Sequence, residues 1–148
     1  MAGKIHVEIS QQPLDINKAY VFVSDPGHGA INSFIGVVRD RNFGKDVEGV
    51  SYDVFEPLAV KSLQDICKTV RDRQNGQINI FIEHFKGRLP VGGISVVIAV
   101  STPHRAESFE ACRPLIEDLK HHAPIWKQEH YTDGDSEWVK GHALCQSA

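Results

Sequence analysis

The sequence predicts an α+β fold, with a mixed, mainly antiparallel sheet and helices packed on it. Short segments in which apolar and polar residues alternate, typical of strands, are interspersed with stretches that place apolar residues at helical spacing. Their order is strand, helix, strand, strand, helix, strand, strand, helix, strand, which lacks the regular alternation of a doubly wound parallel sheet. A chain of 148 residues is long enough for a core of its own. We therefore expect a single domain over residues 1–148, with a mobile tail from about residue 141.

The first half of the chain contains clear boundary signals for its helices. Asp15 can cap a short helix that reaches Val23. Pro57 suits the first turn of a longer helix, which should end at Asn75-Gly76, a pair that favours a left-handed cap. Strands are predicted at Ile5–Ile9, Ala30–Arg39 and Val47–Phe55. Since only a short charged loop separates the last two, we expect them to pair as a hairpin.

The second half contains the most apolar segment, Ile94–Ser101, which we expect at the centre of the sheet. Thr102 and Pro103 are the residue types of a helix cap and a first helical position. That helix should end near His122, because Pro124 cannot continue it. Further strands are predicted at Ile78–Ile82 and Ile125–Tyr131. The residues predicted to be buried include Phe109, Cys112, Leu115, Ile116 and Leu119 on the helix, and Trp126 and Trp138 after it.

Composition and motifs argue against several classes of function. The net charge of −3 will not attract nucleic acid, so any anion site must be a local cluster of basic residues. No apolar run approaches the length of a membrane span, and the N-terminus lacks a signal-peptide core, so we expect a cytoplasmic protein. The histidines lack metal-ligand spacing, and dinucleotide and P-loop motifs are absent. We therefore expect no metal site and no cofactor.

The cysteines offer one alternative chemistry. Cys67, Cys112 and Cys145 are scattered without a CxxC pair, which indicates reduced thiols. Cys67 and Cys112 fall on the buried stripes of predicted helices, where cysteine usually behaves as an inert small hydrophobe, and Cys145 lies in the tail. A cysteine-persulfide sulfurtransferase is therefore a weaker hypothesis than a site built from basic residues.

Basic residues gather at three places in the predicted structure. Lys120 lies on a last helical turn and Lys127 on the strand that follows, so the corner at Pro124 can aim two ammonium groups into one pocket. Arg39 ends a strand. His104 and Arg105 lie on the first turn of a helix, where free N–H groups favour anions. As a set, these residues predict a site for a ligand with negative groups, although each one alone also has an ordinary role on a solvated surface.

The helix that carries Arg105 and Lys120 holds them far apart. With a rise of about 1.5 Å per residue, the fifteen residues between them span roughly 22 Å, which is too far for one small ligand. Either the two ends contact different parts of a long substrate, or a second subunit brings them together in a symmetric dimer.

Several motifs carry a resemblance to a known family. They are Gly29-Ala30, Phe34-x-Gly36-x-Val38-Arg39, Gly44-x-x-Val47, Ile82-x-His84-x-x-Gly87-x-Leu89, Ser101-x-x-His104-Arg105-x-x-x-Phe109, Leu119-Lys120-x-x-x-Pro124-Ile125-Trp126-Lys127-x-Glu129, Asp133-Gly134 and Trp138-Val139. In this order and over most of its length, the chain resembles the large, catalytic subunit of molybdopterin synthase. The long motif around the two lysines is the specific one.

The resemblance implies an α/β-hammerhead-like fold and a sulfurtransferase of molybdenum cofactor biosynthesis. Such an enzyme adds two sulfurs to cyclic pyranopterin monophosphate and so forms the dithiolene of molybdopterin. The sulfur arrives as a thiocarboxylate on the C-terminal Gly-Gly of a small ubiquitin-like carrier subunit. Family members form a homodimer with a carrier at each end, a heterotetramer in which each active site borrows residues from the neighbouring chain.

The resemblance also implies roles for individual residues. Lys120 and Lys127 match the family's two essential lysines, with Lys120 beside the carrier's terminal carbonyl and Lys127 facing the pterin. The positions that match substrate-binding residues are Val37, Val38, Arg39, Arg73, His104, Arg105, Gln128 and Glu129. The carrier supplies the sulfur, so the reaction requires no cysteine of this chain. A non-catalytic dimeric module that binds a phosphorylated ligand or a partner's C-terminal tail would present the same basic pocket, and stays open as the alternative.

Overall fold

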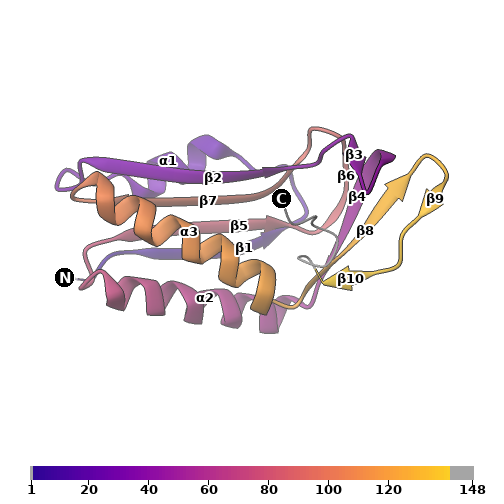
Figure 1. Ribbon diagram of the computed structural model, residues 1–148. Helices are drawn as coiled ribbons and strands as arrows, with labels where there is room; N and C mark the ends of the chain where they lie inside the picture. The colour runs from indigo at the N-terminus through magenta and orange to yellow at the C-terminus, as the bar shows by residue number, and fades with distance from the viewer. Residues whose placement is uncertain (1, 141–148) are drawn as a thin grey trace.

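The computed structural model describes residues 2–140, which form two sheets (Figure 1). The first sheet has four strands in the order β1 (Ile5–Ser10), β5 (Asn79–Phe85), β7 (Ile94–Thr102) and β2 (Ala30–Val37). β1 runs parallel to β5, whereas β5 with β7 and β7 with β2 are antiparallel pairs. The sheet is therefore mixed and mainly antiparallel, as predicted, and the apolar strand β7 has an interior position.

The second sheet lies at one end of the first (Figure 1). Its strands are β10 (Val139–Lys140), β8 (Ile125–Tyr131), β4 (Lys45–Val54) and β3 (Arg41–Asn42), with β6 (Gly87–Pro90) paired to β4 and β9 (Gly134–Asp135) paired to β8. The predicted hairpin between the strands that became β2 and β4 is wrong, because β2 pairs with β7 and β4 pairs with β8 and β6. A bulge at Gly36 and Val37 disrupts the end of β2, and the chain then crosses to the second sheet.

Helices cover both faces of the four-stranded sheet. α2 (Glu56–Arg73) and α3 (Arg105–His122) lie on one face and α1 (Ile16–Val23) lies on the other (Figure 1). Because side chains alternate along a strand, Ile80 and Ile82 of β5 pack with Leu63 and Leu115 of the two long helices, while Phe81 packs on the α1 side. Burial on both faces explains the nearly continuous apolar sequence of β5 and β7.

Local sequence signals predicted the C-terminal ends of α2 and α3, but strand pairing shifts the beginning of α3. Helix α2 ends at Arg73 and is followed by left-handed residues at Asn75 and Gly76 (φ 54° and 77°), as predicted. Helix α3 ends at His122, as predicted from Pro124, but begins at Arg105 rather than at Pro103. Thr102 is not the cap, because it extends β7 and pairs with Ala30 of β2. Its hydroxyl donates to the carbonyl of His104 at 2.7 Å.

Two large apolar side chains predicted to be buried are exposed instead. Phe109 is 65% exposed and Trp138 is 48% exposed. Helix α3 buries Ser108, Ala111, Cys112, Leu115 and Leu119, a face that excludes Phe109. Trp126 is half-buried, with the ammonium group of Lys140 5.6 Å from the centre of its ring. Within residues 2–140, no helix combines the length and apolar character needed to cross a membrane. The predicted mobile tail, with Cys145, lies outside the described residues.

Candidate active site

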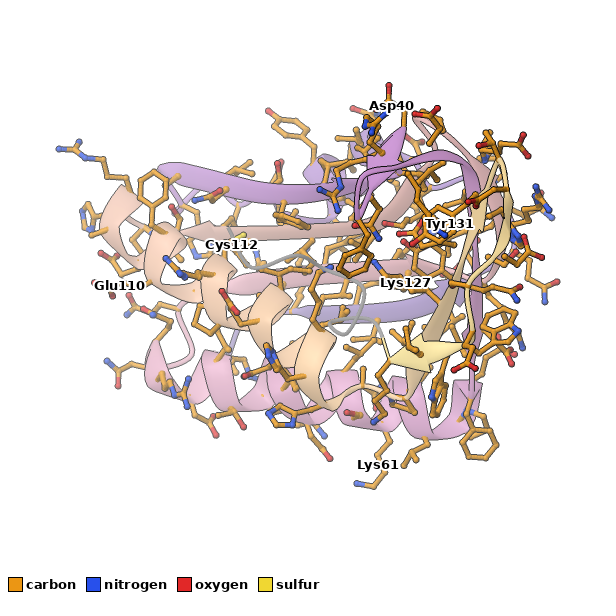
Figure 2. The ribbon with its side chains drawn as sticks, turned by 45° about the vertical axis from the view of Figure 1, so that its right-hand side comes forward. Asp40, Lys61, Glu110, Cys112, Lys127 and Tyr131 are labelled. Atoms are coloured by element: carbon orange, nitrogen blue, oxygen red, sulfur yellow. The ribbon has the colours of Figure 1, made fainter. Side chains whose placement is uncertain are left out.

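A cavity of about 330 Å³ opens where the second sheet meets the C-terminal end of α3. This volume is within the usual range for small-molecule sites. Residues that line it come from both sheets and from α3: Phe34, Ile35, Gly36, Val37, Arg39, Tyr52, His84, Ser95, Val96, Ile116, Leu119, Lys120, Ile125 and Lys127. The cavity therefore combines segments from most of the length of the chain, and Figure 2 shows the position of Lys127 within this region.

Lys120 and Lys127 both line this cavity. Lys120 lies on the last turn of α3, and the extended backbone at Ala123 and the following proline turn the chain directly into β8. Along β8, alternation places Lys127 on the same face as Ile125, toward the cavity. Lys127 is only 7% exposed, whereas Lys120 is half-buried. Lys120 and Lys127 are seven positions apart in the sequence, on either side of a single corner of the chain. The corner thus brings two ammonium groups into a partly dry site, where charge interactions are stronger than in water.

Arg39 supplies a third cation, and buried polar groups hold it. It follows β2, lines the cavity and donates from Nη2 to the Asn42 side-chain oxygen at 3.3 Å. The Asn42 amide in turn donates to Glu129 at 3.1 Å. Burial raises the pKa of the Glu129 carboxyl, while Lys127, Arg39 and the Asn42 hydrogen bond act in the opposite direction. Glu129 is 4% exposed and does not line the cavity, so it supports Arg39 through Asn42.

Gly36 forms part of the cavity wall with its backbone alone. A Cβ atom built on Gly36 would lie 2.7 Å from Val96 Cγ1 and 2.9 Å from the hydroxyl oxygen of Ser95, closer than ordinary contacts allow. Val37 follows at the rim and is half-exposed, whereas Val38 points into the core beneath the second sheet. Of these two valines, only Val37 lines the cavity.

Four further residues predicted for the site do not line this cavity. His104 and Arg105 are exposed at the N-terminal end of α3, where His104 Nδ1 lies 3.6 Å from Glu107. Arg73 is exposed at the C-terminal end of α2, at the same end of the molecule and opposite the second sheet (Figure 1). Gln128 lies on the other face of β8 from Lys127 and donates to the carbonyl of Ser136 at 3.1 Å. The length of α3 separates His104 and Arg105 from the cavity, as the sequence predicts.

The sequence-based interpretation missed His84, Tyr52 and Ser95 as lining residues. His84 is 4% exposed, its Nδ1 lies 2.8 Å from the carbonyl of Phe85, and the edge of its ring meets Tyr52 with centroids 5.1 Å apart. Burial lowers the pKa of His84 to about 4; the bond to Phe85 opposes this, and Lys120 and Lys127 reinforce it. The available signal was alternation along β5, which puts His84 on the same face as Ile82.

A separate ionic cluster lies on the four-stranded sheet, beside α1. His6, Glu8 and Glu83 place possible metal-ligand atoms within 4.8 Å of one another. The ammonium nitrogen of Lys18, on α1, is 2.7 Å from Glu83 and 3.5 Å from Glu8. Its hydrogen bond with Glu83 is the main cause that raises the pKa of Lys18. Because Lys18 pairs with both carboxylates, we interpret the cluster as an ion network that attaches α1 to the sheet.

Comparisons with known proteins identify the family of the chain. The sequence profile of the MoaE protein family matches residues 9–122. This chain belongs to the MoaE family. The molybdopterin synthase catalytic subunit of Synechococcus elongatus is 44% identical over 95% of this chain and 85% of its own. The corresponding subunit of Dictyostelium discoideum is 41% identical over 98% of this chain and 91% of its own.

Solved structures agree with this MoaE assignment. Molybdopterin synthase from Staphylococcus aureus superposes with a TM-score of 0.84 at 32% identity, over 89% of this chain and 95% of its own. A complex of subunits 1 and 2 of the molybdopterin-converting factor from Helicobacter pylori gives a TM-score of 0.69 at 23% identity, over 90% of this chain and 88% of its own. The second likeness shows the shared fold.

Proposed function

We propose that this MoaE-family chain is the catalytic subunit of a molybdopterin synthase. It transfers two sulfurs from the thiocarboxylated C-terminus of a small carrier subunit to cyclic pyranopterin monophosphate, which forms the dithiolene of molybdopterin. The observation that carries the proposal is the meeting of Lys120, Lys127 and Arg39 in one cavity of a chain from this family.

The charge of the cavity suits these substrates. Among the described residues that line it, none is Asp or Glu, whereas Lys120, Lys127 and Arg39 are cationic. A pterin phosphate and a thiocarboxylate are both anions, so they gain from fixed positive charges in a partly dry site. In this proposal Lys120, at the end of α3, polarises the carrier's terminal carbonyl, and the more deeply buried Lys127 contacts the pterin.

The same proposal requires no thiol of this chain. Cys67 is fully buried on the inner face of α2, and burial raises the pKa of its thiol to about 12. Burial also raises the pKa of Cys112. Neither cysteine lines the cavity. A thiol that stays protonated and inaccessible is a poor nucleophile, which argues against a persulfide mechanism on either residue.

The distribution of the remaining basic residues supports a dimer. The C-terminal end of α2, with Arg73, and the N-terminal end of α3, with His104 and Arg105, are both at the side of the molecule opposite the second sheet (Figure 1). We propose that a second copy of the chain places this side beside the cavity of its partner, so that each site is completed across a twofold axis. With one small carrier subunit at each end, the assembly would be a heterotetramer, and the reaction would take place in the cytoplasm.

Reconstitution with purified components tests the function. The chain is mixed with thiocarboxylated carrier and cyclic precursor, and dithiolene formation is followed for wild type, Lys120→Ala and Lys61→Ala. Lys61 is a matched control, because it is exposed on α2 and pairs only with Asp65 among the described residues, away from the cavity (Figure 2). We expect turnover by wild type and Lys61→Ala and none by Lys120→Ala. Binding of both ligands without turnover by the wild type would favour the binding-module alternative.

A further inference from the structure

The cavity contains cations to stabilise negative charge, but the proposed reaction also has to dispose of a proton. When a thiocarboxylate sulfur forms a bond to a carbon of the substrate, an oxygen substituent of that carbon takes up a proton and leaves as water, and the product is a thioester between carrier and pterin. Water must then cleave the acyl–sulfur bond to free the carrier, and the attacking water must lose a proton. A proton acceptor with an available lone pair near neutral pH is therefore needed within reach of that bond.

The titratable groups around the cavity leave one such acceptor. Lys120 from α3, Lys127 from β8 and Arg39 after β2 are cations, and Tyr52 from β4 is a phenol. Strand β7 contributes Ser95 and Val96, neither of which titrates. Glu129 is buried behind Asn42 and does not reach the surface of the cavity. On β5, the lining residue is His84.

The orientation of His84 is fixed by its neighbours. A carbonyl oxygen can only accept, so the 2.8 Å contact to Phe85 places the ring proton on Nδ1. In the neutral ring, Nε2 then carries the lone pair. The ring of Tyr52 packs nearly perpendicular to the imidazole, at an interplanar angle of 74°, and restricts its rotation. The histidine thus presents a preorganised acceptor beside two ammonium groups.

We propose that His84 is the proton acceptor for the water that releases the carrier, acting through Nε2. This inference rests on the proposed sulfur-transfer function. In the step, the water oxygen forms a bond to the acyl carbon while one of its protons goes to Nε2. The carbon–sulfur bond breaks and its electron pair stays on sulfur, as a thiolate beside the lysines. The carboxylic acid of the carrier loses its remaining proton to solvent, and His84 returns its proton to solvent.

The surrounding charges make this acceptor responsive to the substrates. Burial and the two lysines lower the pKa of His84 to about 4, so near neutral pH the ring is neutral and ready to accept. The phosphate of the bound carrier–pterin adduct brings negative charge that offsets the lysines, which raises the pKa of His84 toward its ordinary value and makes it a better base. The base therefore becomes effective when the phosphorylated adduct is bound.

The test separates carrier release from sulfur transfer. Wild type, His84→Gln and His84→Asn are each studied in a single turnover with thiocarboxylated carrier and precursor, and intact mass spectrometry follows the carrier–substrate adduct and the free carrier carboxylate. Gln can keep an acceptor near Nε2 and Asn a donor near Nδ1, but neither takes up a proton near neutral pH. We expect adduct to form and accumulate in both variants, with release slowed by roughly 10²- to 10⁴-fold.

A histidine variant outside the cavity controls for general effects. His6→Gln removes a ring on the α1 face of the four-stranded sheet, where it stacks on Phe81 and lies 2.9 Å from Glu83, and should release carrier at the wild-type rate. Release at the wild-type rate by folded His84→Gln would overturn the inference and leave the proposed function standing. Absence of both adduct and product with wild type would overturn the proposed function, and this inference with it.

A second measurement uses only the wild-type enzyme, so it does not require any variant to fold. The rate constant for adduct breakdown should fall tenfold per pH unit below the pKa of His84 in the complex, between about 4 and 6.5. If the variants do not fold, a wild-type breakdown rate that does not fall as the pH is lowered through this window and below about 4 would refute the role of His84 by itself.

Discussion

The lowered pKa of His84 predicts that the stability of the protein depends on pH through this one residue. In the folded chain the pKa is about 4, against an ordinary value of 6.5, mainly because the ring is buried. Between these two values the unfolded chain binds more protons than the folded chain. The free energy of unfolding therefore rises with pH across this window and falls as the pH is lowered through it.

The size of the effect follows from the shift. A difference of one pKa unit corresponds to about 1.36 kcal/mol, so a shift from 6.5 to about 4 corresponds to about 3 kcal/mol at acid pH. At neutral pH the contribution nearly vanishes, because the ring is neutral in both states. For a protein with a typical stability of about 5–15 kcal/mol, this is a large part of the total.

Urea unfolding of wild type and His84→Gln at a series of pH values measures this contribution. Both proteins are compared at one fixed concentration, so that any association affects them equally. Subtracting the two stabilities removes the acid sensitivity of all other groups. We expect wild type to lose about 3 kcal/mol relative to the variant between neutral pH and about pH 4. A difference that is constant across this range would show that His84 is not held neutral by burial, and would refute the reasoning.

Three further substitutions test the site. Lys127→Met removes a buried ammonium and should lower dithiolene formation by at least about 100-fold in the reconstitution assay; near-wild-type turnover by the folded variant would contradict this. Asn42→Ala strips Glu129 of its amide partner and should lower the unfolding free energy by about 1–3 kcal/mol while raising KM for the precursor, measured by urea unfolding and steady-state kinetics; normal values for both would reject the supporting role. Cys67→Ala should keep full activity in the reconstitution assay, and loss of turnover in a folded variant would restore the persulfide hypothesis.

Local chemistry predicted the ends of elements well but not the pairing of strands. Asn75-Gly76 and Pro124 fix chain direction within a few residues, and both helix ends lie where these signals place them. The choice of partner for β2 depends instead on which strand buries its apolar face, and that information is spread over the whole chain. Adjacency in sequence therefore suggested a hairpin that does not form.

The same contrast applies to the candidate site. Lys120 and Lys127 were found because one short corner carries both of them. His84 was missed as a site residue because its approach to them arises from the pairing of β5 with β7 and from the packing of α3, neither of which a sequence motif reports. Arg105 was assigned to the same ligand on the basis of family resemblance, and a single chain keeps it at the far end of α3.

The missing side chain at Gly36 fixes the shape of one wall of the cavity. A Cβ atom there would lie 2.7 Å from Val96 Cγ1 and 2.9 Å from the hydroxyl oxygen of Ser95, and both of these residues also line the cavity. An added methyl group would therefore push the wall itself out of place. We expect the cavity to tolerate changes among the surrounding aliphatic residues better than the addition of a single carbon atom at this position.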